Sequence, residues 1–252
     1  MFLSLKSSLG VPGSVASAPP PPFPPHPPTQ FESRLIFYGA LSAAGGTDYQ
    51  MGQLIHNVTI DSSGNSNVSV NKTDNSTNVN ISSFNNSGTV SSNLASSFVI
   101  RAIGNRNGVN SAIQGADTND SVGVVGQGNP GKIDIFNGNE TEFIKFEVVN
   151  LNPALTISIK TVYVIRANWI GTTIRPLMRL APFDPLGLET GYPINRRGHV
   201  IWPIDVSSSQ MDLVGTGTGT NGSFQIGVGS PEPEADIGYG LYAIDFDVTN
   251  TL

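Results

Sequence analysis

The chain of 252 residues contains no cysteine, and this absence excludes disulfide bonds, thiolate metal sites and cysteine nucleophiles together. Charged residues are scarce as well, at 13% of the chain against the roughly 25% that is usual for soluble proteins. Gly, Ser, Thr and Asn are plentiful instead, so the polarity is mostly uncharged, a composition typical of secreted, cell-surface and virion proteins. Without disulfides, such a protein must be stabilised by the size of its core or by its neighbours.

A net positive charge and long apolar runs are also missing. The formal net charge is -6, which argues against a nucleic-acid partner because binding a phosphate backbone requires clustered Lys and Arg. No stretch approaches the ~20 apolar residues of a membrane helix, so no membrane partner is expected. Lys6, Gly10 and Pro12 interrupt every candidate for a signal-peptide core. We therefore expect an uncleaved N-terminus and arrival outside the cell by lysis or assembly.

Residues 1–30 are predicted to form an extended N-terminal arm. Eight of the ten residues from 19 to 28 are proline, which predicts a polyproline II rod that extends about 3.1 Å per residue. Such a rod can act as a spacer or lie in an aromatic groove on a partner. The arm residues expected to contact neighbouring subunits are Pro19, Pro20, Pro21, Pro22, Phe23, Pro24 and Pro25.

Residues 31–97 are predicted to contain one strand near residues 34–38 and a set of small hairpins rich in Asn, Ser and Thr. Short alternating pieces, such as residues 58–60, 67–70 and 78–82, are separated by turn-forming Asp, Ser, Asn and Gly residues. Each hairpin has one thinly apolar face. We expect a small lobe that rests on the main domain or is covered by another chain.

Residues 98–252 are predicted to form the main domain, with stronger strands at 98–103, 132–136, 142–149, 155–170, 198–204, 223–228 and 238–248. In the longest, Leu155, Ile157 and Ile159 begin one face, which Thr161, Tyr163 and Ile165 are expected to continue. Near Val162, Val164 and Trp169 the strand becomes apolar on both faces. Many strands separated by Gly and Pro turns predict an all-β fold with a β-sandwich or jelly-roll-like core. A β-barrel with an appended lobe is the alternative.

The sequence contains no convincing motif for catalysis or for a cofactor. Residues 126–131 read GQGNPG and match a dinucleotide fingerprint in letters only, because a strand-like run follows where a helix is required. His26, His56 and His199 are far apart and have no second ligand at a metal-binding spacing. No Gly-x-Ser-x-Gly elbow selects a nucleophile. We predict no enzyme activity, no cofactor and no metal.

Alternating carboxylates near the C-terminus raise the one metal hypothesis, a Ca²⁺ site at Glu232, Glu234 and Asp236 or at Asp245 and Asp247. We prefer solvated strand faces, because alternate residues of a strand share one face. On that interpretation Asp245 and Asp247 point to solvent while the apolar residues between them pack inward.

The basic residues Arg175, Arg179, Arg196 and Arg197 gather in the sequence around Trp202. Arginine and aromatic residues are enriched at protein interfaces, where the guanidinium pairs with carboxylates or stacks on rings. These five residues are the predicted partner-binding patch. The alternative is that the arginines pair with local carboxylates such as those of Asp184 and Glu189.

In overall style the chain resembles virion accessory proteins of tailed bacteriophages, meaning decoration (cement) proteins and related head or tail components. The start MFLSLKSSLG, the Pro-rich arm, the cysteine-free strands and the Asn/Ser/Gly-rich hairpins carry the resemblance. It implies a β-sandwich or jelly roll, a homo-oligomer, and an arm that clamps neighbouring capsid subunits. The predicted function is therefore a non-catalytic structural role in a virion or similar extracellular assembly.

Two other classes of protein remain open. A carbohydrate-binding or adhesin-like module would use Trp169 or Trp202 as a stacking platform for sugars. An enzyme on a jelly-roll scaffold would show a pocket in which His and carboxylate side chains converge.

Overall fold

The structure is a computed structural model. It describes residues 33–36, 41–43, 49–51, 53–72, 79–81, 86–115, 121–126, 131–136, 140–168, 174–182, 190–207, 212–214, 220–229 and 237–250. These ranges are nearly all β-strand, which confirms the all-β prediction. Within them, no helix is long and apolar enough to cross a membrane. The predicted arm, residues 1–30, lies outside the described residues.

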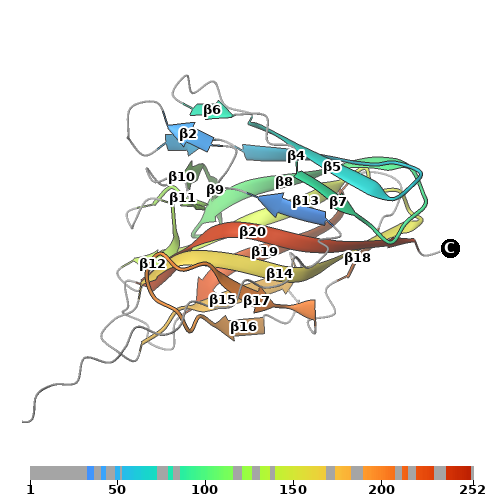
Figure 1. The fold of residues 1–252 in the computed structure, drawn as a ribbon. Coiled ribbons are helices and arrows are strands. Elements are labelled where there is room, and N and C mark those ends of the chain that lie inside the picture. The colour runs from blue at the N-terminus through green and yellow to red at the C-terminus, as the bar shows by residue number, and fades with distance from the viewer. Residues whose placement is uncertain are drawn as a thin grey trace, which may run out of the picture.

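Eighteen of the described strands join into one curled antiparallel sheet, and its two halves face each other (Figure 1). In the first half the strands pair in a continuous order across the sheet. That order is β7 (Asn86–Thr89), β5 (Asn65–Lys72), β4 (Gln53–Ile60), β8 (Ser96–Arg106), β13 (Glu140–Val149), β19 (Thr220–Gly229), β15 (Leu177–Pro182) and β16 (Thr190–Pro193). The short strand β9 (Val109–Ser111) turns back on the end of β8.

The second half is built around the longest pair, β14 (Leu155–Asn168) and β20 (Ile237–Asn250). The outer edge of β14 pairs with β17 (Trp202–Asp205) and β18 (Asp212–Val214). The outer edge of β20 pairs with β1 (Ser33–Ile36), β11 (Val122–Val124) and β12 (Ile133–Phe136), and β11 continues to β10 (Ile113–Gly115) and β3 (Tyr49–Met51). Strands β2 (Leu41–Ala43) and β6 (Val79–Ile81) form a separate pair.

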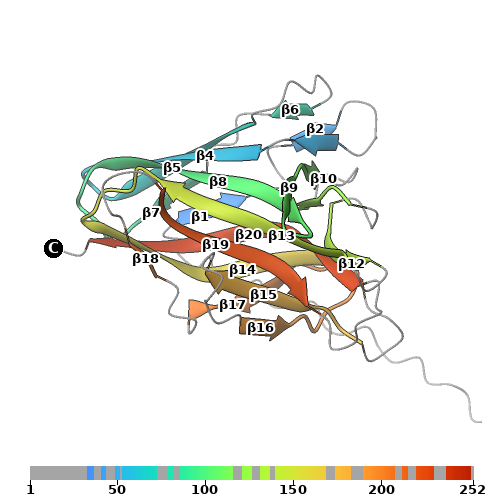
Figure 2. The same cartoon turned by 180° about the vertical axis from the view of Figure 1, so that it is seen from behind.

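The two halves are joined at a corner by β12, which pairs with β20 on one side and with β13 on the other. Figure 2 shows this corner from behind, at the end of the molecule away from the C-terminus. Several buried polar side chains lie at this corner.

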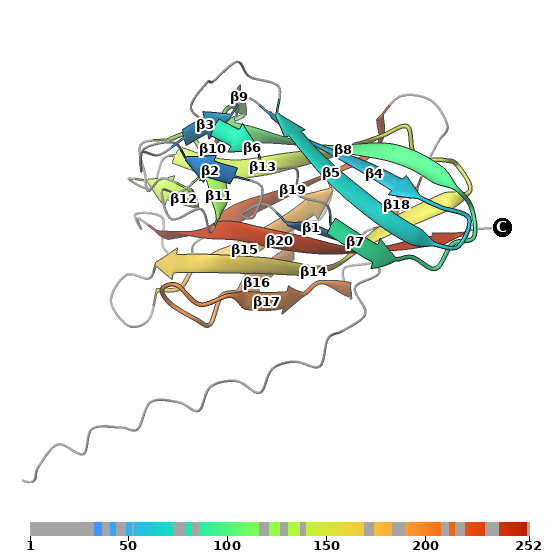
Figure 3. The same cartoon turned by 45° about the horizontal axis from the view of Figure 1, so that its top comes forward.

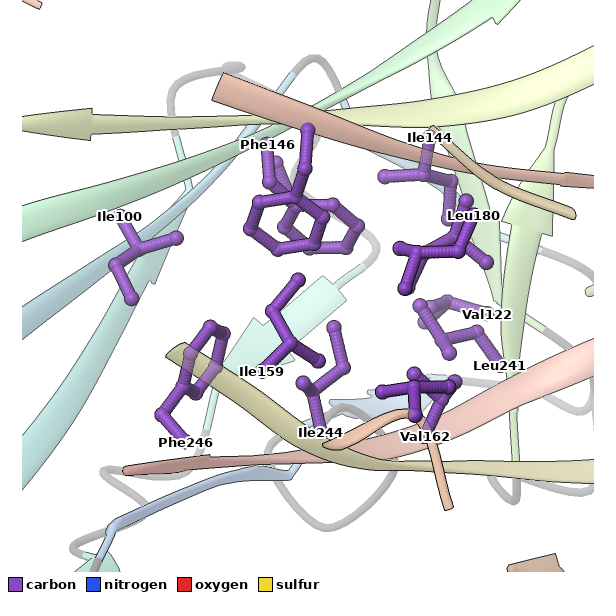
Figure 4. Packing of buried hydrophobic residues seen from close by; sticks show 14 of the residues in the cluster. Ile100, Val122, Ile144, Phe146, Ile159, Val162, Leu180, Leu241, Ile244 and Phe246 are labelled. Carbon is purple, nitrogen blue, oxygen red and sulfur yellow. The ribbon is translucent and has the colours of Figure 1, made fainter. Parts of the chain in front are cut away.

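A single apolar core fills the space between the halves, as the side chains in Figure 4 show. Phe146 of β13 and Phe224 of β19 stack with ring centroids 4.6 Å apart. Phe224 also meets Phe246 of β20, from the opposite half, edge to face at 6.1 Å. Aromatic pairs in these arrangements add to the stabilisation that burial gives. The core therefore holds the two halves together by direct contact.

Strands β8, β12, β13, β19 and β20 confirm the predicted strands of the main region. The predicted strand at 198–204 is wrong at its start, because β17 begins only at Trp202.

The predicted apolar face of the longest strand is correct up to Ile159 and at Ile165, and wrong at Thr161 and Tyr163 between them. Ile159 lies opposite Phe246 and Thr161 lies opposite Asp245, so Lys160 is an extra residue in a β-bulge. A bulge moves the side chains that follow it to the other face, here those of residues 161–163, before the register shifts again between Tyr163 and Val164. Val162 and Val164 are therefore buried, whereas Thr161 and Tyr163 are only half-buried.

The Asn/Ser-rich hairpin of β4 and β5 lies beside β8 (Figure 3), and it buries more side chains than expected. Every second residue of β4 is buried, and the residues between are half-buried or exposed. The buried residues are Leu54, His56, Val58 and Ile60. Strand β4 pairs with β8 over its whole length, from Gln53 opposite Ile103 to Ile60 opposite Ser96. The thinly apolar face is thus sufficient to join the common core.

A hydrogen bond across the core links the two halves. The hydroxyl of Tyr239, on β20, donates to the backbone carbonyl of Gly227, on β19, at 2.5 Å. Tyr239 is fully buried, and burial raises the pKa of its hydroxyl well above the ordinary value. We expect Tyr239→Phe to lower the free energy of unfolding by about 1–2 kcal/mol, because a buried carbonyl loses its partner. Urea unfolding measures this, and an unchanged midpoint would contradict it.

Candidate functional site

The connection between β16 and β17, residues 194–201, crosses from the edge of one half to the edge of the other. The buried Ile194 anchors its start, where the amide of Ile194 donates to the carbonyl of Pro176 at 3.1 Å. Gly198, with φ of 83°, makes a turn, and its amide donates to the carbonyl of Ala167 at 2.8 Å. The residues between and after these anchors are held at the surface.

The predicted Arg/Trp patch lies partly on this connection. The guanidinium of Arg196 lies 5.6 Å from the centroid of the half-buried Trp202 ring, a cation–π contact. Nη1 of Arg175 donates to Oδ1 of Asn195 at 2.7 Å, which brings Arg175 beside the same connection. Arg197 is exposed. Arg175, Arg196, Arg197 and Trp202 are therefore neighbours in the structure.

Arg179 is placed differently from the other arginines. It is half-buried on β15, and its Nε would lie 2.1 Å from a Cβ added to Gly229 of β19. The side chain thus packs across a glycine of the neighbouring strand. Asp184 and Glu189, the local carboxylates of the alternative hypothesis, lie outside the described residues, as do Trp169 and Pro19–Pro25.

This surface also includes two apolar residues that the sequence did not point to. Val200 and Ile201 are 43% and 42% exposed, and they directly precede Trp202. The surface formed by Arg175, Arg196, Arg197, Val200, Ile201 and Trp202 is called the 194–202 surface below. It combines exposed apolar area with arginine and tryptophan, the residue types enriched at protein interfaces.

The carboxylate predictions have mixed outcomes. Glu232, Glu234 and Asp236 lie outside the described residues. The prediction that Asp245 points to solvent is wrong: the residue is 4% exposed, and the hydroxyl of Tyr163 donates to its Oδ2 at 2.8 Å. Asp247 is half-buried. Among the described residues, no group of three or more His, Asp or Glu side chains is arranged to hold a metal ion.

The histidines that the structure describes are also separate. His56 is fully buried on β4, and its Nδ1 donates to the carbonyl of Ile100 at 3.2 Å. Burial lowers the pKa of His56 to about 4, and this backbone hydrogen bond opposes the effect only in part. His199 is exposed. His56 is therefore a neutral core residue.

A second polar site, missed from the sequence, lies at the β12 corner. Lys132, Asp134 and Glu142 are all buried, with exposed fractions of 9%, 4% and 3%. Nζ of Lys132 donates to Oδ1 of Asn168 at 3.3 Å, and the amide of Asp134 donates to Oε2 of Glu142 at 3.2 Å. These four residues, called the corner cluster below, come from β13, the end of β14 and the region of β12. A Lys and an Asp alternating within an otherwise apolar strand were the available signal.

The electrostatics of the corner cluster follow from its burial. Burial and, after it, the nearby Asp134 charge raise the pKa of the Glu142 carboxyl to about 9, so Glu142 is protonated at neutral pH. Arg106 opposes this shift. Burial also lowers the pKa of the Lys132 amine, assisted by the charge of Arg166 and opposed by that of Asp134. The cluster thus holds a protonated Glu142 carboxyl and shifts the Lys132 amine toward its neutral form.

No protein family model, no curated protein and no solved structure matches this chain. The described residues define a class only: an all-β protein with one curled antiparallel sheet, a surface of arginine and apolar residues at one edge, and a buried polar cluster at the corner.

Proposed function

We propose that the protein is a non-catalytic structural component of a virion or similar extracellular assembly, of the capsid decoration or cement kind. The 194–202 surface carries this proposal, because exposed Val200 and Ile201 adjoin Arg196, Arg197 and Trp202. An apolar centre bordered by arginines is the arrangement that a protein partner covers. The partners would be further copies of this chain and other subunits of the assembly.

The finer fold assignment belongs to the same proposal. Two antiparallel halves that face each other over one core support a β-sandwich or jelly-roll fold. Such folds present broad edges and loops for lateral contacts between subunits. The Pro-rich segment that includes Pro19–Pro25 would supply a second contact as an extended arm.

The surface gives less support to the carbohydrate-binding alternative. A sugar stacks on an open ring face, whereas Arg196 lies over the ring of Trp202. Trp202 is moreover only half-exposed and packs against the core. A protein partner can use both groups as they are, because arginine on an aromatic ring still offers its edge to carboxylates.

Light scattering of the purified chain over a range of concentrations tests this proposal. We expect the wild-type protein to form an oligomer, and the double substitution Val200→Ser and Ile201→Ser to shift it toward the monomer. Val109→Ser is the matched control, because Val109 is 69% exposed but lies on β9, away from this connection. The control should keep the wild-type mass.

Two results would count against the proposal. A wild-type chain that is monomeric at every concentration, and that binds no subunit of its source particle, would remove the assembly role. Equal dissociation by Val109→Ser would show that the effect is not specific to the 194–202 surface.

A further inference from the structure

The corner cluster brings an amine and a side-chain amide together inside the protein. In the strand register, Gly238 of β20 lies opposite Asp134 on one side and opposite Asn168 on the other. A Cβ on Gly238 would lie 2.4 Å from the Cβ of Asp134, so only glycine permits this approach. With no side chain on β20 between them, the Lys132 amine reaches the Asn168 carboxamide and donates to its Oδ1 at 3.3 Å.

The backbone on both sides of this amine is held in place. The carbonyl of Lys132 accepts a hydrogen bond from the amide of Val124 at 3.0 Å, and the hydroxyl of Ser121 donates to the carbonyl of Gly131 at 3.0 Å. Gly123 packs so closely that an added Cβ would lie 1.9 Å from the Lys132 carbonyl oxygen. Fixed orientation of two reacting groups is a large part of what accelerates a reaction between them.

We propose that Lys132 and Asn168 form an intramolecular isopeptide bond. Nζ of the neutral amine attacks Cγ of the Asn168 carboxamide, and a new Nζ–Cγ bond forms. The Cγ–Nδ2 bond then breaks, and the nitrogen leaves as ammonia after taking up one proton from the attacking amine. The product is a secondary amide that links the residue before β12 to the last residue of β14. No oxidant, reductant or second substrate is needed.

The surroundings supply what each part of this step requires. An amine attacks only when it is unprotonated, and burial beside a second cation favours that form. Lys132 is buried, and the charge of Arg166 acts on it. The proton must pass from Nζ to the leaving nitrogen, and Asp134, whose charge also acts on Lys132, is the adjacent group that can relay it. Glu142 contacts Asp134 and acts through it, as a positioning residue that keeps a proton on the pair.

The bond would have a structural purpose in this chain. The sequence has no cysteine, so disulfides cannot cross-link it. A link from residue 132 to residue 168 would close a loop that includes all of β13 and almost all of β14. Closing a loop of this kind restricts the unfolded chain and stabilises the fold. The reaction occurs once per molecule, so it agrees with a non-catalytic role without depending on it.

Mass spectrometry of the purified wild-type chain tests the proposal. After unfolding and trypsin digestion, we expect the peptide that contains Lys132 to be joined to the peptide that contains Asn168, at a mass lower by one ammonia than their sum. Trypsin should not cut after Lys132, because an acylated lysine is not a substrate. Separate, unmodified peptides and cleavage after Lys132 would overturn the proposal.

Variants then assign the roles. Glu142→Gln keeps size and hydrogen bonding but cannot exchange a proton, so we expect folded protein without the link. Glu147→Gln is the matched control: it makes the same change on β13, at a residue paired with Lys145, and should remain linked. Circular dichroism and a urea midpoint establish that each variant is folded. A fully linked Glu142→Gln protein would overturn the role of Glu142, and an unlinked Glu147→Gln protein would overturn its specificity.

Discussion

Replacing Glu142 with glutamine should remove most of the loss of stability that the wild-type protein shows between about pH 7 and pH 8.5. Burial and the Asp134 charge raise the pKa of Glu142 to about 9, from 4.5 when the side chain is free. Between these values the folded protein holds a proton that the unfolded chain has released. The stabilisation is complete below the unfolded pKa and declines as pH rises toward the folded one, by up to about 1.4 kcal/mol per pH unit.

Urea unfolding at several pH values measures this slope. The slope is the quantity to compare, because loss of a cross-link would change the stability of Glu142→Gln at every pH without adding this dependence. Asp134 on β12 and Arg106 on β8 are the charged groups that act on Glu142, and both remain in the variant. Glu147→Gln serves again as the control for the same chemical change on β13. Equal slopes in wild-type and Glu142→Gln proteins would show that Glu142 is ionised in the fold.

The second large effect on the stability of the fold is expected at acid pH, and it comes from His56. Burial lowers the pKa of this imidazole from 6.5 to about 4. The folded state therefore excludes a proton that the unfolded state binds. The resulting stabilisation is complete above the unfolded pKa and is lost as pH falls to the folded pKa, a total of roughly 3 kcal/mol.

The substitution His56→Gln should flatten the stability profile between about pH 6.5 and pH 4. Glutamine can still donate to the carbonyl of Ile100, the acceptor of the His56 hydrogen bond, but it does not titrate. The exposed His199 offers a matched control for the chemical change itself, as His199→Gln. A His56→Gln protein with the wild-type acid slope would place the acid sensitivity elsewhere.

Glu142 and His56 make the stability of the fold depend on pH in opposite directions. Between about pH 4.5 and 6.5, rising pH removes stabilisation through Glu142 and adds it through His56. The two effects oppose each other there, so we expect a broad stability maximum in mildly acidic solution. The decline above about pH 7 would come from Glu142 alone of this pair.

Most strands could be predicted because alternation and turn residues are local signals. The strand patterns of residues 142–149 and 223–228 can be recognised in the sequence without knowing which strands they pair with. The bulge at Lys160 was not predictable in the same way, because it depends on where β20 pairs with β14. Once an extra residue enters a strand, the face of each later side chain follows from the partner strand.

The candidate sites could likewise be predicted only where their residues are close together in the sequence. Arg196, Arg197 and Trp202 are near one another in sequence, so their grouping at one surface could be anticipated. Val200 and Ile201 were not selected, because an apolar pair near a tryptophan is as compatible with burial as with exposure. In the structure, the anchoring at Ile194 and Gly198 helps to hold this connection at the surface.

By itself, the sequence determined the all-β class, the absence of disulfides and the low positive charge, because composition and period-2 alternation act locally. The tertiary structure alone decided that two distant segments meet at the corner cluster, where Lys132 lies beside Asn168 and Asp134 beside Glu142. Gly238 and the corner geometry of β12 create that proximity, and burial sets the charge states within it. Neither long-range register nor desolvation can be read from a linear chain, and both govern the chemistry proposed for this protein.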